Sequence, residues 1–426
     1  MLADSAGPWL VAWGDPLAGH AHAPIYGWGL LLPYWLSLAG ATSLWAAASA
    51  LQVFHALAAP LVLLIALSLR PSSLLPAAVA ALAVALDGGL LDTARSGAEG
   101  YLAPVWAGVM LVGRSHRHTA WGPSVAWGGA AMAVMNHPLA VCLVPFLVGL
   151  PLRSRSGQVG LGLGLLLLLP VLANGSWAES GATGGLRGEE WVALDAWLRE
   201  GGLAAWALLV APFLALLRAE FRWLAVSTLG ALALLFVVGG QLGYLRDHHL
   251  RLLSVPMAAC WAATPGRWGG LLLLLLRPPD FKLPPEGAPP RPGTLGMTTG
   301  IASDILRAQL PGPFYVDGAW VSGALVAEPS AVMLDLHLRG LALVQLHPDG
   351  EPVVIVSSVR DGLGDPPEEG LLSSGSHHWV LRDPAPHALL CSESTRRGGA
   401  WDFLALAHPE RAGATLQGWG DSCGVQ

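Results

Sequence analysis

The stretch SLWAAASALQVFHALAAPLVLLIALSL occupies Ser43–Leu69 and ends against Arg70. A helix needs about 20 consecutive apolar residues to cross about 30 Å of hydrocarbon, so this stretch predicts a membrane-spanning helix. Its one ionisable residue is His55. An intramembrane histidine is either functional or hydrogen-bonded to a neighbouring helix, and we favour the second interpretation for His55.

Further apolar stretches follow as far as Arg277. Several carry internal prolines, which membrane helices tolerate when neighbouring groups satisfy the freed carbonyls. Hydrophobic residues make up 53% of the chain and charged residues 12%, against about 25% charged in soluble domains; mean hydropathy is +0.52. We therefore predict a polytopic α-helical membrane domain over 43–277 with about ten spans, near 43–69, 72–91, 100–113, 122–136, 138–151, 158–173, 203–218, 222–240, 250–263 and 267–277.

Alternate loops between these spans differ in charge. Short cytoplasmic loops retain arginine during insertion, so we place one set of loops in the cytoplasm and the other, which holds most of the acids, outside. The first set carries Arg70, Arg114, Arg117, Arg153, Arg155, Arg218, Arg222 and Arg267. The second comprises the loop with Asp87, Asp92 and Glu99, the loop 174–202 and the segment Arg246–Arg251. This arrangement predicts that residues 1–42 and everything after Arg277 lie outside, in a multi-pass protein of a bacterial inner membrane.

The N-terminal segment Met1–Tyr26 has neither a signal peptide nor a span, although the topology places it outside. Either the first span inserts with its N-terminus outward or a preceding helix is missing from the sequence, and we favour the missing helix.

The tail after residue 277 changes character. Residues 278–296 are rich in proline and predict a stiff linker, and 297–426 predict a small extracytoplasmic α/β domain. We expect helices at 303–310 and 330–338, strands at 313–320, 379–381, 388–391 and 403–406, and a hairpin that joins 341–346 to 352–356 through His-Pro-Asp-Gly.

The four cysteines fall into two pairs. Cys142 and Cys260 lie within spans and are expected to act as small apolar residues. Cys391 and Cys423 lie in the tail, where an oxidising compartment permits a disulfide; sequence alone leaves the pairing open.

Three polar clusters are predicted on the outer face. The first is Asp4, Asp15, His20, His22 and Tyr26, followed by an apolar stretch with three aromatic residues that fits a helix in the membrane interface. A carboxylate held beside an acceptor acts as a general base; alternatively, the segment is a solvated chain end.

The N-terminal elements resemble the start of the GT-C glycosyltransferases, which include protein O-mannosyltransferases and lipid A aminoarabinose transferases. The likeness lies in an outer Asp, a His-x-Pro-x-Tyr element at His22–Tyr26, an interfacial helix that ends in Leu-Ala-Gly, and a long span closed by arginine. The resemblance implies a multispan enzyme that takes a sugar from a polyprenyl-phosphate donor, with the catalytic Asp at Asp4 rather than Asp15. The family's first span has no counterpart in this sequence, and its His-Pro-Pro is His-Ala-Pro here.

The second cluster, Asn136-His137-Pro138, is either a polar turn or, as the resemblance implies, places His137 near the donor phosphate. The third is Arg246, His248, His249 and Arg251, whose cations suit a phosphate or anchor the chain at the interface. The adjacent His248 and His249 do not share a helical face, which disfavours a metal pair.

Three functions follow from these observations. The first is a glycosyltransferase that moves a sugar from a polyprenyl-phosphate carrier to a glycan, lipid or protein acceptor at the outer face. The second is a non-catalytic membrane scaffold. A transporter is disfavoured because neither internal repeats nor intramembrane acids along a path are visible. Motifs for ATPases, serine hydrolases and zinc proteases are absent from the sequence, and the net charge of -6 with a single lysine, Lys282, gives no reason to expect nucleic-acid binding. The cofactor is unknown: no motif indicates one, and metal-independent and metal-assisted transfer both stay open.

Overall fold

The structure is a computed structural model that describes residues 53–87, 90, 102–152, 154–173, 189–241, 245, 247–276, 294–320, 329–342, 345, 351–357, 368, 370–375 and 378–382. The described residues fall into two compact units, one up to residue 276 and one from residue 294, and the division between Leu283 and Pro284 lies inside the segment predicted to be a linker.

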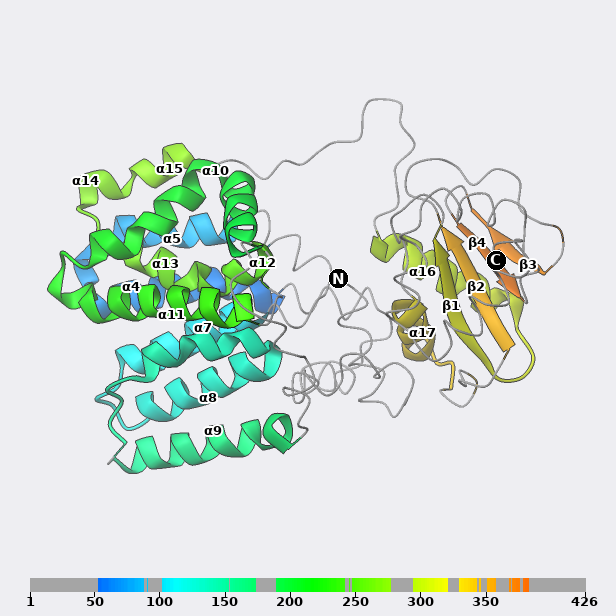
Figure 1. The fold of residues 1–426 in the computed structure, drawn as a ribbon, viewed down its shortest axis with the longest axis horizontal. Coiled ribbons are helices and arrows are strands. Elements are labelled where there is room, and N and C mark those ends of the chain that lie inside the picture. Colours follow the sequence, from blue (N-terminus) through cyan, green and yellow to red (C-terminus); the bar gives the residue numbers. More distant parts are fainter. Residues whose placement is uncertain are drawn as a thin grey trace. The chain divides into compact units, whose positions relative to one another are not determined.

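The first unit is helical (Figure 1). Its described elements, in chain order, are α4 (Ala58–Leu69), η2 (Pro71–Ser73), α5 (Leu74–Ala85), α7 (Ala103–Ser115), α8 (Gly122–Asn136), η4 (Pro138–Leu147), α9 (Arg155–Ala173), α10 (Glu189–Ala215), η5 (Ala219–Phe221), α11 (Arg222–Gln241), α12 (Asp247–Leu250), η6 (Arg251–Leu253), α13 (Ser254–Trp261), α14 (Gly266–Gly269) and α15 (Leu271–Leu275).

Helical structure thus occurs in every segment predicted to be a span, but not every one of these segments is a continuous α-helix. The segment after His137 is a 3-10 helix, since Pro138 and Pro145 remove backbone donors. The last predicted span is divided into α14 and α15 at Gly269, where a side chain would meet Pro76. Within the described ranges, Ala219–Gly240 is the one helix long and apolar enough to cross a membrane by itself, while Val53–Leu69, Pro71–Ala85 and Gly201–Ala215 are shorter apolar helices. The ten-span topology remains a prediction.

Helix α10 contains a sharp kink at Gly202, whose φ of 57° lies in the left-handed region that glycine adopts at no steric cost. The kink separates an amphipathic first part from the apolar part that was predicted to be a span. Trp197 and Leu198 in the first part are buried in the helical core, whereas Trp191 is 69% exposed. Trp197 and Leu198 therefore attach the first part of α10 to the protein core.

Small residues allow the helices of this unit to approach closely. A Cβ atom on Gly129 of α8 would lie 2.6 Å from the backbone nitrogen of Met110 on α7, and one on Gly160 of α9 would lie 2.7 Å from Cα of Ser124. Glycine and alanine contacts of this kind are typical of helix packing in membranes. The buried core is likewise rich in alanine, with Cys142 and Cys260 fully buried as free thiols, as expected for small apolar residues.

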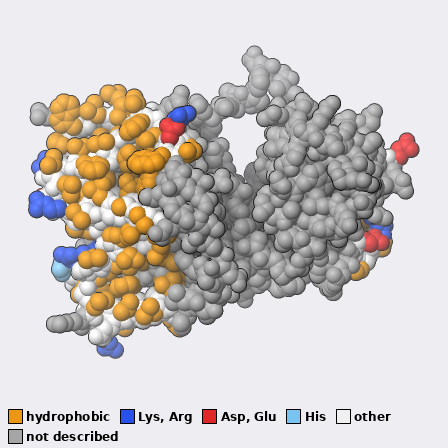
Figure 2. Space-filling model, in the orientation of Figure 1, with side chains coloured by type: hydrophobic (Ala, Val, Ile, Leu, Met, Phe, Trp, Pro, Cys, Tyr) orange, Lys and Arg blue, Asp and Glu red, His pale blue; other side chains and the backbone are white. Residues whose placement is uncertain are grey.

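The outward faces of the same helices are apolar. Figure 2 shows hydrophobic side chains over much of the described surface of this unit, with arginines gathered along its left edge. Leu217 and Leu274, for example, are about four-fifths exposed, at 79% and 80%. Soluble monomers rarely expose contiguous apolar patches larger than a few hundred Å², so this surface is suited to a lipid environment.

Residues in or next to loops that were predicted to share a side of the membrane contact one another. In the arginine-rich set, Arg114 donates to the carbonyl of Val148 at 2.7 Å and lies over the ring of Trp223. In the other set, Arg251 pairs with Asp87. The orientation of the two ends relative to a membrane remains a prediction.

The second unit is a two-layer α/β arrangement. It comprises α16 (Thr294–Ala308), β1 (Phe314–Trp320), α17 (Pro329–Leu338), β2 (Glu351–Ser357), β3 (Leu371–Ser374) and β4 (His378–Arg382). The sheet order is β1-β2-β4-β3, with β1 and β2 parallel and the other two pairs antiparallel. Helices α16 and α17 contact each other and the sheet, and both lie on the same side of it in Figure 1.

Buried residues explain this layering. On α16, Met297, Ile301 and Ile305 recur at intervals of four and face the core, as expected for an amphipathic helix. On β4, the successive residues Trp379, Val380 and Leu381 are all buried.

The structure corrects part of the predicted tail. The strand at 313–320, the helix at 330–338 and the strand at 379–381 are present as β1, α17 and β4. The helix expected from residue 303 begins earlier, at Thr294. The predicted hairpin of 341–346 with 352–356 is wrong, because β1 and β4 occupy both edges of β2. The strands expected at 388–391 and 403–406 lie outside the described residues.

Candidate functional site

His137 stands at the end of α8, immediately before Pro138. A residue before proline is pushed out of the helical region, and His137 accordingly has extended dihedrals of φ -151° and ψ 122°. Its Nδ1 accepts a hydrogen bond from the backbone N–H of Leu139 at 3.2 Å, so the imidazole caps helix η4. Because Nδ1 is an acceptor in this arrangement, the neutral ring carries its proton on Nε2.

The ring of His137 lies beside that of His249, which α12 supplies from 112 positions further along the chain. The ring centroids are 4.8 Å apart and the planes are inclined at 53°. Both side chains are buried, with exposed fractions of 8% and 4%. Two of the predicted outer clusters thus meet in one place, which their separation in sequence did not reveal.

Arg251 follows two residues later, at the start of η6. Its side chain is buried, and its Nε lies 3.8 Å from Oδ1 of Asp87, the residue that follows α5 closely. The same carboxylate oxygen accepts from the backbone N–H of Leu90 at 3.2 Å. The positive charge of Arg251 is therefore balanced by an acid from a different loop of the outer set.

Two buried polar groups adjoin these residues in sequence. Asn136 precedes His137 and donates through Nδ2 to the carbonyl of Met132 at 2.7 Å, while its Oδ1 has no hydrogen-bond partner within the described ranges. Ser254, three residues beyond Arg251, is also buried, and its Oγ has no partner in the same part of the chain. Leaving a buried polar group without a hydrogen bond costs about 1–3 kcal/mol. A ligand that donates to Asn136 Oδ1 or Ser254 Oγ would recover part of this energy.

The remaining predicted site residues are placed differently. The backbone of His248 lies in α12, but its side chain is not described. Asp4, Asp15, His20, His22, Tyr26, Arg246 and the cysteines Cys391 and Cys423 lie outside the described residues. Among the described residues, no group of three or more histidines, cysteines and acids is arranged to hold a metal ion.

Asp87 is a residue of this site that the sequence did not predict. It was recognised only as an acid in an outer loop. The signal that could have identified it was charge balance, because a buried arginine in a membrane protein is expected to pair with an acid, and Asp87 belongs to the loop set that also contains Arg251.

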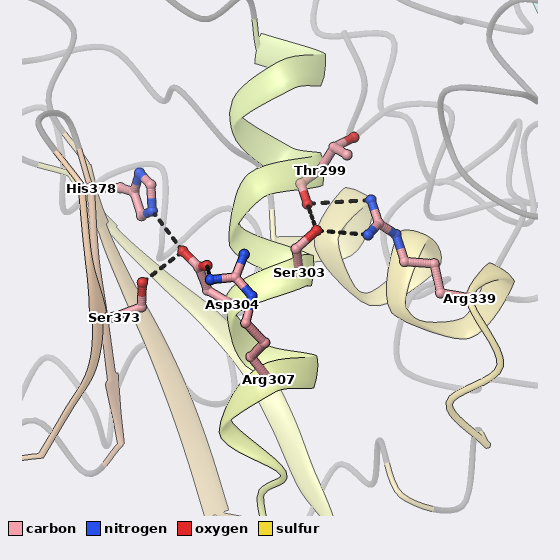
Figure 3. A network of polar contacts seen from close by, with 7 residues as sticks. All are labelled: Thr299, Ser303, Asp304, Arg307, Arg339, Ser373 and His378. Carbon is pink, nitrogen blue, oxygen red and sulfur yellow. Dashed lines mark hydrogen bonds and ion pairs between the residues drawn. The ribbon is translucent and has the colours of Figure 1, made fainter.

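A second polar network lies in the α/β unit (Figure 3). Asp304 on α16 accepts from Ser373 Oγ at 2.6 Å and lies 3.6 Å from His378 Nε2, which joins the helix to β3 and β4. On the other side of α16, Arg339 donates to Ser303 Oγ at 2.7 Å and pairs with the fully buried Asp335 at 2.9 Å. The network holds both helices against the sheet, and we interpret it as structural.

No protein family, curated protein or solved structure matches this chain. The functional argument therefore depends on the chain's own residues.

Proposed function

We propose that the chain is a membrane glycosyltransferase that moves a sugar from a polyprenyl-phosphate donor to an acceptor at the outer face of the membrane. The observation that supports the proposal is the contact between His137 and His249, with Arg251 two residues away. Two polar clusters that were assigned independently to the outer face thus come together at one end of an apolar helical unit.

The chemistry of transfer explains why cations are needed there. The acceptor hydroxyl oxygen forms a bond to the anomeric carbon while the bond from that carbon to the donor phosphate breaks. A carboxylate, which the GT-C resemblance assigns to Asp4, takes the hydroxyl proton. The departing polyprenyl phosphate gains negative charge, so imidazole and guanidinium donors held nearby stabilise the transition state more than the ground state.

A non-catalytic scaffold is the alternative, and two observations favour it. His137 caps η4, and Arg251 pairs with Asp87. Both contacts give these residues a structural role that requires no donor.

The test is a binding and transfer assay with a panel of polyprenyl-phosphate sugars on purified protein. The informative variant is His137→Asn, since asparagine is a good N-cap residue and preserves the cap while the imidazole is lost. We expect about 10²–10³-fold slower transfer, the usual cost of removing one transition-state donor, with little change in thermal stability.

Two further variants complete the assay. Asp4→Asn should abolish transfer while donor binding is retained. Arg199→Gln is the matched control, because Arg199 is an exposed arginine in the same predicted outer loop set and pairs only with its helical neighbour Asp195 among the described residues. If wild-type protein neither binds nor transfers any donor in the panel, the scaffold interpretation replaces the transferase.

A further inference from the structure

The opposite end of the helical unit contains a pocket of about 700 Å³. It lies where the loop between α7 and α8 meets the segment that leads into α9. Arg117 and His118 line it from the first loop, and Ser154 and Arg155 line it from the second. None of the described residues that line it is acidic, which indicates a site for an anion.

The arginines of this pocket carry charge that no carboxylate balances within the described part of the chain. Arg117 uses its Nε to donate to Nε2 of His118 at 3.1 Å, and this bond does not involve its two terminal nitrogens. Arg155 makes no hydrogen bond or ion pair with any other described residue. Two guanidinium groups are therefore available to a ligand.

A third guanidinium adds to the positive potential. Arg114, at the end of α7 beyond the predicted span, is buried and donates to the carbonyl oxygens of Val148 and Gly149. Burial, followed by the nearby charge of Arg117, lowers the pKa of Arg114 to about 10, so the group is still a cation at neutral pH. No described carboxylate pairs with it.

The helix ends contribute in the same direction. Helices α8 and α9 both begin at the pocket, where Thr119 accepts from the N–H of Gly122 and Ser154 accepts from the N–H of Gly157, each at 3.0 Å. The N-terminus of a helix carries a partial positive charge. This charge supplements the arginines.

An apolar track runs from the pocket along α9. Val159 lines the pocket, and Leu163 and Leu166 follow it at intervals of four and three, which places all three on one face of the helix. Their exposed fractions are 58%, 48% and 61%. A free phosphate has no use for such a track, whereas the acyl chain of a lipid does.

We propose that this pocket binds the phosphate headgroup of an anionic phospholipid in the cytoplasmic leaflet, with an acyl chain along Val159, Leu163 and Leu166. The inference rests on the membrane placement contained in the proposed function but not on transferase activity. A lipid-binding measurement therefore fails or succeeds independently of any sugar donor.

The experiment uses the full chain, delipidated in a neutral detergent, and titrates it with dioleoylphosphatidylglycerol or dioleoylphosphatidylcholine while retained lipid is counted by native mass spectrometry. We expect the anionic lipid to bind more tightly than the zwitterionic one. The double variant Arg117→Gln/Arg155→Gln should weaken binding of the anionic lipid by about 30-fold. Each arginine near a membrane surface contributes about 1 kcal/mol, and 1.4 kcal/mol corresponds to a factor of ten in affinity.

The matched control is Arg222→Gln, because Arg222 is an exposed arginine in another loop of the same charge set and does not line the pocket. The Arg222→Gln variant should bind the anionic lipid as tightly as the wild type. If the wild-type protein binds the two lipids with equal affinity, the proposal is overturned whatever the variants do. Unchanged binding in the double variant overturns it as well. Displacement of the lipid by millimolar inorganic phosphate would identify the site as one for free phosphate instead.

Discussion

The close approach of α7 and α8 predicts different stabilities for alanine variants of two neighbouring glycines. Gly128 and Gly129 lie in the interior of α8, but a Cβ atom on Gly128 meets nothing within 4 Å, whereas one on Gly129 lies 2.6 Å from the backbone nitrogen of Met110 and 2.9 Å from its Cα. Backbone atoms cannot rotate away as a flexible side chain can. Gly129→Ala therefore forces the two helices apart, and Gly128→Ala does not.

The magnitudes follow from two opposing terms. Replacing glycine by alanine inside a helix stabilises the helix by about 0.5–1 kcal/mol, and this gain is common to both variants. Overpacking costs about 1–3 kcal/mol and applies to Gly129 alone. We expect the two variants to differ by that amount, with the unfolding midpoint shifted by about 2–4 °C for each kcal/mol in a unit of this size.

Thiol accessibility provides the assay. Cys142 and Cys260 are fully buried in the helical unit, so a thiol-reactive dye reports their exposure as the unit unfolds on heating in detergent. Replacing Cys391 and Cys423 by serine beforehand confines the signal to this unit. Identical midpoints for Gly128→Ala and Gly129→Ala would refute the packing of α7 against α8.

Two further predictions follow from the same structure. Gly160→Ala on α9 should destabilise relative to Gly162→Ala, because a Cβ at Gly160 meets the backbone of Ser124 while Gly162 is open; the same dye assay decides, and an equal effect would contradict the α8–α9 contact. In the α/β unit, Asp304→Ala should raise hydrogen exchange in peptides covering 294–308 and 371–382 by about 5–30-fold, equivalent to about 1–2 kcal/mol for lost buried hydrogen bonding. Arg307→Ala should change the exchange little, because Arg307 pairs with Asp304 through a side chain that is 78% exposed, and exposed ion pairs contribute little. Equal exchange in those two variants would show that the Asp304 network does not hold the helix.

Sequence patterns predicted the helices better than the sheet for a physical reason. A helix satisfies its hydrogen bonds locally, so the apolar runs at 122–136 and 222–240 were sufficient to identify α8 and α11. A strand takes its partners from elsewhere in the chain. The Asp-Gly turn signal favoured a local hairpin, but β2 pairs with β1 and β4, and no local pattern encodes that choice. Strand β3 was missed because Leu371–Ser374 is short and contains two serines.

The candidate site shows the same limit. The distribution of arginines assigned His137 and His249 to the same side of the membrane. This assignment gives their depth relative to the membrane but not their lateral distance from each other. Their contact depends on how α8, α12 and α13 pack, and packing among apolar helices is set by the shapes of small side chains rather than by a period that can be counted. The pairing of Asp87 with Arg251 was hidden for the same reason.

The pairing of Asp87 with Arg251 distinguishes the two functional interpretations. A donor phosphate that binds Arg251 must compete with a carboxylate whose Oδ1 is already 3.8 Å from Nε. Asp87→Asn preserves an oxygen that can accept from the N–H of Leu90 but removes the competing charge. Losing the partner of a buried arginine costs about 3–5 kcal/mol. The cost here should be about 1–2 kcal/mol, because the distance is long and the Asp87 side chain is 22% exposed, which screens the pair.

Asp87→Asn should therefore lower the unfolding midpoint in either case. If Arg251 binds the donor, the same variant should also tighten binding of polyprenyl phosphate by about tenfold, since a charge-assisted hydrogen bond contributes about 1.5–3 kcal/mol. In a scaffold only the stability changes. Titration of the variant and the wild type with polyprenyl phosphate in detergent separates the two, and weaker or unchanged binding in Asp87→Asn would remove Arg251 from the donor site.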